Sequence, residues 1–248
     1  MDAVKRIIFA ADIGSLQELR AYLKVFKGEI GIIKLGMELL MHSLLTGEPI
    51  FQTVLKESDF QIMFDMKFGD IPATVAGAAK EVAKYGQGRI FGFTVHCSAG
   101  KNALEKAVQA VTENFPPESN APPYVIGVTL LTSLDQSDLA ELGIKGAPTE
   151  VVSRWAEIAS NAKVPAIVCS SKETRSVLMV NPALTVINPG IRFADSDLGT
   201  QKRVTTPKDA FLNGAAYVVM GSDLRKGDPV ANARRAAAEI EIGLAQRQ

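Results

Sequence analysis

Three charged residues follow a stretch that otherwise reads as a buried β-strand. Residues 61–64 are Gln-Ile-Met-Phe, and Asp65, Lys67 and Asp70 come next. Asp65 and Lys67 are two residues apart, so on a strand their side chains share one face, about 6–7 Å apart along it. A buried carboxylate and ammonium group are costly unless they are paired or take part in chemistry. We therefore take this cluster as the candidate site and ask what surrounds it.

The elements that must position this cluster alternate along the chain between short apolar runs and helix-period segments. The expected strands cover residues 6–11, 30–33, 61–67, 90–95, 124–129, 166–169, 184–187 and 216–220. Strands that are each followed by a helix favour parallel βα units, and eight of them predict a closed (β/α)8 TIM barrel, an α/β fold. We expect one catalytic domain over residues 1–248. An open doubly wound sheet is disfavoured because no glycine-rich dinucleotide turn follows the first strand.

The composition is that of an ordinary globular protein. The chain has 248 residues, 47% of them hydrophobic, with 27 basic and 27 acidic residues. This charge balance indicates neither a nucleic-acid-binding nor a membrane-binding surface. The two cysteines lack metal-ligand spacing, and the N-terminus runs into a strand without a signal-peptide pattern. We expect a cytoplasmic protein.

Polar residues fall where several of the expected strands end. They are Asp12, Lys34, Asp65, Lys67, His96, Thr132 and Ser133. The C-terminal strand ends of such a barrel meet at one mouth and carry the chemistry. Each residue alone has an ordinary structural explanation as a cap or a loop residue. Together, with charges of alternating sign, they predict one functional site.

Two later loops have the composition of a phosphate site. Residues 188–192 and 221–225 follow the seventh and eighth strands, and each combines a glycine with an arginine, Arg192 or Arg225. Phosphate groups bind at these loops in many such barrels, where free backbone N–H groups and a guanidinium suit a dianion.

These residues resemble one family, orotidine 5′-monophosphate decarboxylase, over essentially the whole chain. Residues 65–74 read DMKFGDIPAT and are similar to the family's Asp-x-Lys-x-x-Asp signature with its Ile-Pro-x-Thr tail. Four further segments follow in the family's order: IKLG at 33–36, LTS at 131–133, PGIR at 189–192 and GTQKR at 199–203. The signature alone is shared with sugar-phosphate enzymes of the same suprafamily. The combination is far more specific.

The resemblance implies a role for each matching residue. Lys67 would protonate carbon 6 of the pyrimidine within a Lys34–Asp65–Lys67–Asp70 charge array, with Asp65 against the substrate carboxylate. The implied substrate-binding residues are Asp12, Lys34, Thr74, Thr132, Pro189, Arg192, Gln201, Gly221 and Ser222. Asp70 and Thr74 would reach into a partner's site, so the functional unit would be a homodimer. Residues 192–205 would form a closing lid.

The implied reaction converts orotidine 5′-monophosphate to UMP, in pyrimidine biosynthesis, with no metal or organic cofactor. A preorganised ammonium group would stabilise the carbanion that forms when carbon dioxide leaves. The phosphate, far from the reacting carbon, would supply binding energy for this step.

The chain departs from the family's pattern at two positions. Gly69 stands where many bacterial relatives have histidine, at a position that points away from the chemistry. Ser222 stands where relatives usually have an arginine that binds phosphate. A serine hydroxyl cannot replace a bidentate guanidinium, so we expect weakened phosphate binding unless Arg225 or Lys226 compensates.

Two other functions are compatible with parts of this pattern. A metal-dependent sugar-phosphate lyase or decarboxylase of the same suprafamily needs acidic strand ends, whereas the second strand here ends in Lys34. A non-catalytic nucleotide-binding barrel is suggested by Ser222. Activity that is sensitive to EDTA would indicate the metal-dependent enzyme. Binding of UMP without turnover of orotidine 5′-monophosphate would indicate the non-catalytic barrel.

Overall fold

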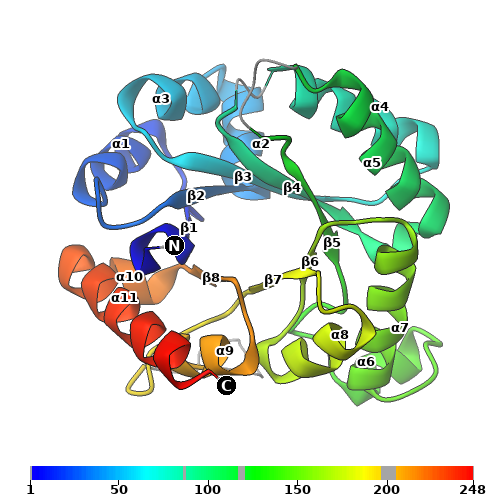
Figure 1. Ribbon diagram of the computed structural model, residues 1–248. Helices are drawn as coiled ribbons and strands as arrows, with labels where there is room; N and C mark the ends of the chain where they lie inside the picture. Colours follow the sequence, from blue (N-terminus) through cyan, green and yellow to red (C-terminus); the bar gives the residue numbers. More distant parts are fainter. Residues whose placement is uncertain (1, 86–87, 117–120, 197–204, 248) are drawn as a thin grey trace.

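Eight parallel strands form a closed barrel in chain order, with helices around its outside (Figure 1). The computed structural model describes residues 2–85, 88–116, 121–196 and 205–247. The strands are β1 (Ile7–Ala10), β2 (Ile32–Gly36), β3 (Gln61–Phe68), β4 (Ile90–His96), β5 (Tyr124–Val128), β6 (Ala166–Val168), β7 (Thr185–Asn188) and β8 (Tyr217–Met220). Because β1 pairs with both β2 and β8, the sheet has no edge, and the predicted (β/α)8 barrel is confirmed.

The helices of the outer layer begin and end at residues with clear local causes. They are α1 (Leu16–Val25), α2 (Met37–Thr46), α3 (Ile50–Glu57), α4 (Pro72–Tyr85), α5 (Lys101–Asn114), α6 (Gln136–Glu141), α7 (Pro148–Asn161), α8 (Thr174–Val180), α9 (Pro207–Asn213), α10 (Ser222–Arg225) and α11 (Pro229–Gln246). Three short 3₁₀ turns are η1 (Ala3–Arg6), η2 (Cys97–Ala99) and η3 (Ser171–Glu173). The side chains of Ser15, Thr206 and Asp228 cap α1, α9 and α11 by accepting from backbone N–H groups. Among the described residues, every helix is too short or too polar to span a lipid bilayer.

The barrel interior is packed with side chains at its N-terminal end. Phe91, Tyr124 and Tyr217 stand at the starts of their strands, and the ring of Phe91 lies 5.3 Å from that of Tyr124 and 4.8 Å from that of Tyr217. Larger apolar layers lie between the strands and the helices. Aromatic side chains therefore fill much of the barrel interior at this end.

The second strand differs from the sequence-based expectation. Residues 30–33 were expected to form a strand that ends before Lys34, but β2 covers Ile32–Gly36 and contains the lysine. Lys34 is buried. A charged residue can occupy this place because two carboxylates reach it, one from Asp12 after β1 and one from Asp65 in β3, which sequence periodicity does not reveal.

Candidate active site

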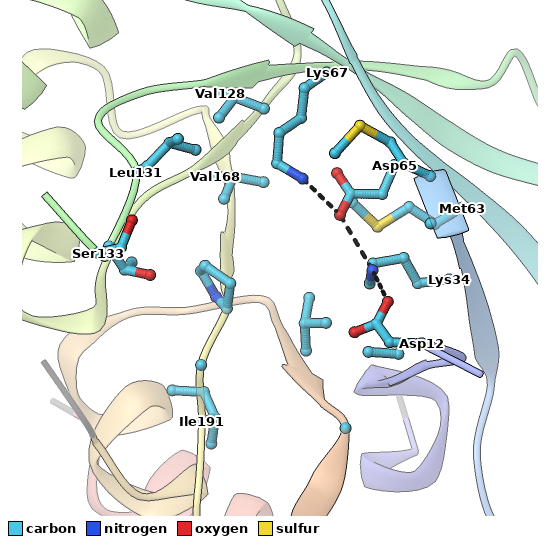
Figure 2. Close-up of a pocket in the computed structure, with 18 of the residues that line it drawn as sticks. Asp12, Lys34, Met63, Asp65, Lys67, Val128, Leu131, Ser133, Val168 and Ile191 are labelled. Carbon is cyan, nitrogen blue, oxygen red and sulfur yellow. Dashed lines mark hydrogen bonds and ion pairs between the residues drawn. The ribbon is translucent and has the colours of Figure 1, made fainter. Parts of the chain in front are cut away.

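A chain of alternating charges crosses the C-terminal ends of β1, β2 and β3 (Figure 2). The Nζ atom of Lys34 lies 2.9 Å from Oδ1 of Asp12 and 3.2 Å from Oδ2 of Asp65. The Nζ atom of Lys67 lies 3.0 Å from the same Oδ2 atom. Each ammonium group therefore faces a carboxylate, and Asp65 is held between two lysines.

The two central side chains of the array are more buried than those at its ends, where the side chain of Asp12 is 52% exposed. The side chains of Lys34 and Asp65 are 9% and 13% exposed, whereas that of Lys67 is 29% exposed. Burial opposes the negative charge of Asp65, but Lys34 and Lys67 outweigh it and hold the pKa of the carboxyl group below its usual value. Asp65 is thus an anion at neutral pH, and Lys67 is the more exposed of the two lysines that line the cavity.

Gly36 leaves room for the ion pair between Asp12 and Lys34. A Cβ atom at this position would lie 3.0 Å from Oδ1 of Asp12 and 3.1 Å from Nζ of Lys34. Both distances are shorter than ordinary van der Waals contact. A side chain here would push the two charged groups aside.

The charged residues form one wall of a cavity of about 540 Å³ at the C-terminal mouth of the barrel. The opposite wall is largely apolar and includes Val128, Val168 and Ile191 (Figure 2). The cavity is also lined by Thr132, Ser133, Pro189, Arg192, Gly221, Ser222 and Arg225. Its size and its combination of one polar and one apolar wall suit a small organic molecule with charged groups.

A bulge in β3 places Asp65 and Lys67 in the cavity. Phe64 pairs with Phe93 of β4 and Phe68 pairs with Val95, so three residues of β3 stand opposite the single residue Thr94. Lys67 has a φ of 48°, one of only two positive values among the non-glycine residues described. The two side chains do face the same cavity, but an irregular backbone, and not the alternation of a regular strand, directs them there.

The comparisons with known proteins agree on one family. The family model "Orotidine 5′-phosphate decarboxylase / HUMPS family" matches residues 5–236. Among curated proteins, orotidine 5′-phosphate decarboxylase of Moorella thermoacetica is 37% identical over 245 residues, which is 98% of this chain and 94% of the relative. The enzyme of Coxiella burnetii is 34% identical over 227 residues, with 91% and 92% of the two chains covered. The chain belongs to this family.

Solved structures support the same assignment. Orotidine 5′-phosphate decarboxylase of Lactobacillus acidophilus matches with a TM-score of 0.80 at 25% identity, covering 95% of this chain and 99% of that one. A Geobacillus kaustophilus protein matches with a TM-score of 0.79 at 28% identity, covering 94% and 99%. Membership of the orotidine 5′-phosphate decarboxylase family, which the motifs predict, is thus confirmed, as is a carboxy-lyase assignment.

Most of the residues that the family motifs single out line the cavity. They are Asp12, Lys34, Asp65, Lys67, Thr132, Pro189, Arg192, Gly221 and Ser222. Gln201 lies outside the described residues, as do residues 197–204 of the expected lid. The structure therefore brings together residues from six of the eight strand ends or the loops that follow them.

Asp70 and Thr74 lie elsewhere in the family's signature segment. Both are exposed, and neither lines the cavity. Oδ1 of Asp70 accepts a hydrogen bond of 2.6 Å from the backbone N–H of Ile71. Among the described residues Asp70 makes no ion pair with Lys67, and Asp12 is the outer carboxylate of the array. A role for Asp70 and Thr74 in a partner's site stays a prediction.

The loop after β8 contains a one-turn helix, α10, that the sequence pattern did not predict. It starts at Ser222, and Arg225 at its end donates from Nη1 to the backbone oxygen of Asp12 at 2.9 Å. The Nε atom of Arg225 is buried without a hydrogen-bond partner. Asp223 accepts from the N–H of Phe193 at 2.8 Å, which ties the loop after β8 to the loop after β7.

His96 lies beside the site and outside the cavity lining. Its Nδ1 atom lies 3.1 Å from Oγ of Ser98, and its ring meets the edge of Trp155. Burial and the nearby charge of Lys67 hold the pKa of His96 below its usual value. The imidazole is therefore neutral at physiological pH and adds no positive charge near Lys67.

Proposed function

We propose that this protein converts orotidine 5′-monophosphate to UMP and carbon dioxide, in pyrimidine biosynthesis, without a metal or organic cofactor. The observation that carries the proposal is the Lys34–Asp65–Lys67 array on the wall of a nucleotide-sized cavity in a chain of this family. The chain would act as one catalytic domain.

The array suits a reaction that leaves negative charge on carbon. The bond between carbon 6 of the pyrimidine and the carboxyl carbon breaks, and its electron pair stays on carbon 6. The ammonium group of Lys67, already fixed by Asp65 at 3.0 Å, stabilises this charge and then transfers a proton to the carbon. Water restores the proton on Lys67.

Asp65 has two effects in this mechanism. It fixes the position of Lys67, and its negative charge lies beside the substrate carboxylate. The like-charge contact is relieved when carbon dioxide leaves, which is a form of ground-state destabilisation. Lys34 contacts Asp65 as well and neutralises part of its charge, which limits the repulsion between Asp65 and the substrate carboxylate.

The remaining cavity residues bind the parts of the nucleotide that do not react. Asp12 and Lys34 contact the ribose hydroxyls, and Thr132 contacts the pyrimidine edge. Arg192 and the backbone N–H groups near Pro189 and Gly221 hold the phosphate. Gln201 would bridge base and phosphate. The distance between phosphate and reacting carbon allows binding energy to support the chemical step.

Phosphate binding is weakened by Ser222. The side chain lines the cavity where an arginine would give a bidentate contact. Arg225 lines the same cavity, with Nη1 bonded to the backbone oxygen of Asp12, and its guanidinium is the group that would compensate.

A homodimer would complete the site. Met37, Met41, Leu44 and Leu45 form one stripe of α2, and all four side chains are exposed. Ile71, next to Asp70, is exposed as well. An apolar helix stripe in solvent is typical of an interface, and the stripe would pack against a second protomer.

One experiment separates this function from the two alternatives. The purified protein is incubated with orotidine 5′-monophosphate, with and without EDTA, while carbon dioxide and UMP are measured. We expect stoichiometric release of both products, unchanged by EDTA. Activity that disappears with EDTA would support a metal-dependent enzyme of the suprafamily. UMP binding by calorimetry without any turnover would support a nucleotide-binding barrel and contradict the proposal.

A further inference from the structure

A buried hydroxyl group lies opposite the bulge that carries the reactive lysine. Thr94 is 1% exposed and lies in the middle of β4, where it alone faces residues 65–67 of β3. It does not line the cavity and would not touch a bound molecule. A threonine within a strand is ordinary in sequence, so no motif draws attention to it.

The hydroxyl group joins the two key residues of the array. Its Oγ1 atom accepts a hydrogen bond of 2.8 Å from the backbone N–H of Lys67. It donates its single proton to Oδ1 of Asp65 at 3.1 Å, a shorter contact than the 3.5 Å to the backbone oxygen of Phe64. One oxygen atom thus holds the backbone of the lysine and the carboxylate of the aspartate.

These two bonds act where the backbone is least favourable. The φ of 48° at Lys67 is a conformation that residues with a Cβ atom rarely adopt and that persists only when surrounding contacts impose it. The ladder between β3 and β4 is interrupted here, so the N–H of Lys67 lacks a strand partner and uses Thr94.

The same hydroxyl determines which oxygen of Asp65 is left for the lysines. Oδ1 is occupied by Thr94, and both ammonium groups contact Oδ2. Rotation of the carboxylate would exchange these partners and alter the distance between Asp65 and Lys67. We infer that Thr94 is a positioning residue of the active site, which sets the geometry of Lys67 and Asp65 without contacting the substrate.

The inference rests on the proposed function, and the test keeps the two apart. Turnover of orotidine 5′-monophosphate by the unchanged protein is measured first. If there is no turnover, the proposed function is contradicted, and hydrogen exchange alone then tests the positioning role of Thr94. In Thr94→Val, which keeps the shape and removes the hydroxyl, the amide of Lys67 should lose its protection from exchange. Retained protection would overturn the inference whether or not the protein is active.

Steady-state kinetics distinguish a positioning role of Thr94 from a general loss of structure. Thr94→Val should lower kcat at least about tenfold, because small misplacements of catalytic groups are costly. KM and the affinity for UMP, which lacks the reacting carboxylate, should stay within about threefold. Thr94→Ser, which keeps the hydroxyl, should recover most of the lost kcat. A kcat of Thr94→Val within about twofold of the unchanged protein would overturn the inference.

Thr129 provides a matched control. It is also a buried threonine and directly follows β5, but its Oγ1 atom donates only to the backbone oxygen of Val168, at 2.7 Å, among the contacts described. Thr129→Val should leave kcat nearly unchanged, and an equal loss in both valine variants would contradict a specific role for Thr94. If circular dichroism shows that Thr94→Val does not fold, Thr94→Ala is used in its place. The same loss of kcat is expected, and a kcat within about twofold of the unchanged protein would again overturn the inference.

Discussion

Lys34 and Lys67 share a single oxygen atom of Asp65, with their Nζ atoms 3.2 and 3.0 Å from Oδ2. Two ammonium groups this close would repel each other strongly without the carboxylate between them. The shared oxygen fixes the positions of the two ammonium groups relative to each other.

Removing the ammonium group of Lys67 should abolish turnover. We expect Lys67→Ala to lower kcat by at least about 10³-fold, because both charge stabilisation and the proton donor are lost. UMP binding and the thermal unfolding profile should persist. Lys101→Ala is the control, since Lys101 pairs only with Glu105 on the surface of α5 among the contacts described. Near-normal activity of Lys67→Ala would contradict the mechanism.

Asp65 should stabilise the fold in a pH-dependent way. The pKa of Asp65 is lower in the folded protein than in the unfolded chain, where it is about 3.9. The contribution of the carboxylate to the free energy of unfolding is therefore complete above pH ~3.9 and is lost as the pH falls through the pKa of the folded protein. At pH 7, Asp65→Asn should lower the free energy of unfolding by about 3 kcal/mol, since the two lysines lose their shared partner.

Urea denaturation between pH 7 and pH 3 measures this effect. The difference in free energy of unfolding between the unchanged protein and Asp65→Asn should be constant near neutral pH and should decrease below pH ~4. Asp195→Asn, which removes an exposed pair with Arg235, should change stability little at any pH. A difference in free energy of unfolding that does not change with pH would show that the charge of Asp65 does not cause the loss of stability.

Restoring an arginine after Gly221 should strengthen phosphate binding. Ser222→Arg adds a charge-assisted contact of about 1.5–3 kcal/mol, so kcat/KM should rise about ten- to hundredfold. Steady-state kinetics with orotidine 5′-monophosphate measure the change. If kcat/KM does not change, Arg225 already serves the phosphate, and Arg225→Ala should then raise KM.

Mixing two inactive variants tests whether Asp70 acts across a dimer interface. Lys67→Ala and Asp70→Ala each inactivate every site of their own homodimers. In a mixed dimer, one site combines an intact Lys67 with an intact Asp70 of the other protomer. Random exchange should restore about a quarter of the original activity. No recovery, despite mixed dimers shown by native mass spectrometry, would place Asp70 in its own protomer's site.

The sequence by itself determined the fold class and most members of the site. Eight apolar runs separated by helical stretches predicted a closed parallel barrel, and the absence of a glycine-rich turn after the first strand disfavoured an open sheet. A barrel brings all C-terminal strand ends to one mouth. Asp12, Lys34, Asp65 and Lys67 could therefore be grouped before any coordinates, although 55 residues separate the first from the last.

The tertiary structure decided how these residues meet. Only the pairing of β3 with β4 produces the bulge that turns Lys67 into the cavity, and only the closeness of β1 to β2 makes Asp12 the outer partner of Lys34. Thr94 lies 27 residues from Lys67 and bonds its backbone. Strand periodicity describes regular backbone within one segment, so it says nothing about contacts between strands or about a bulge that breaks the period.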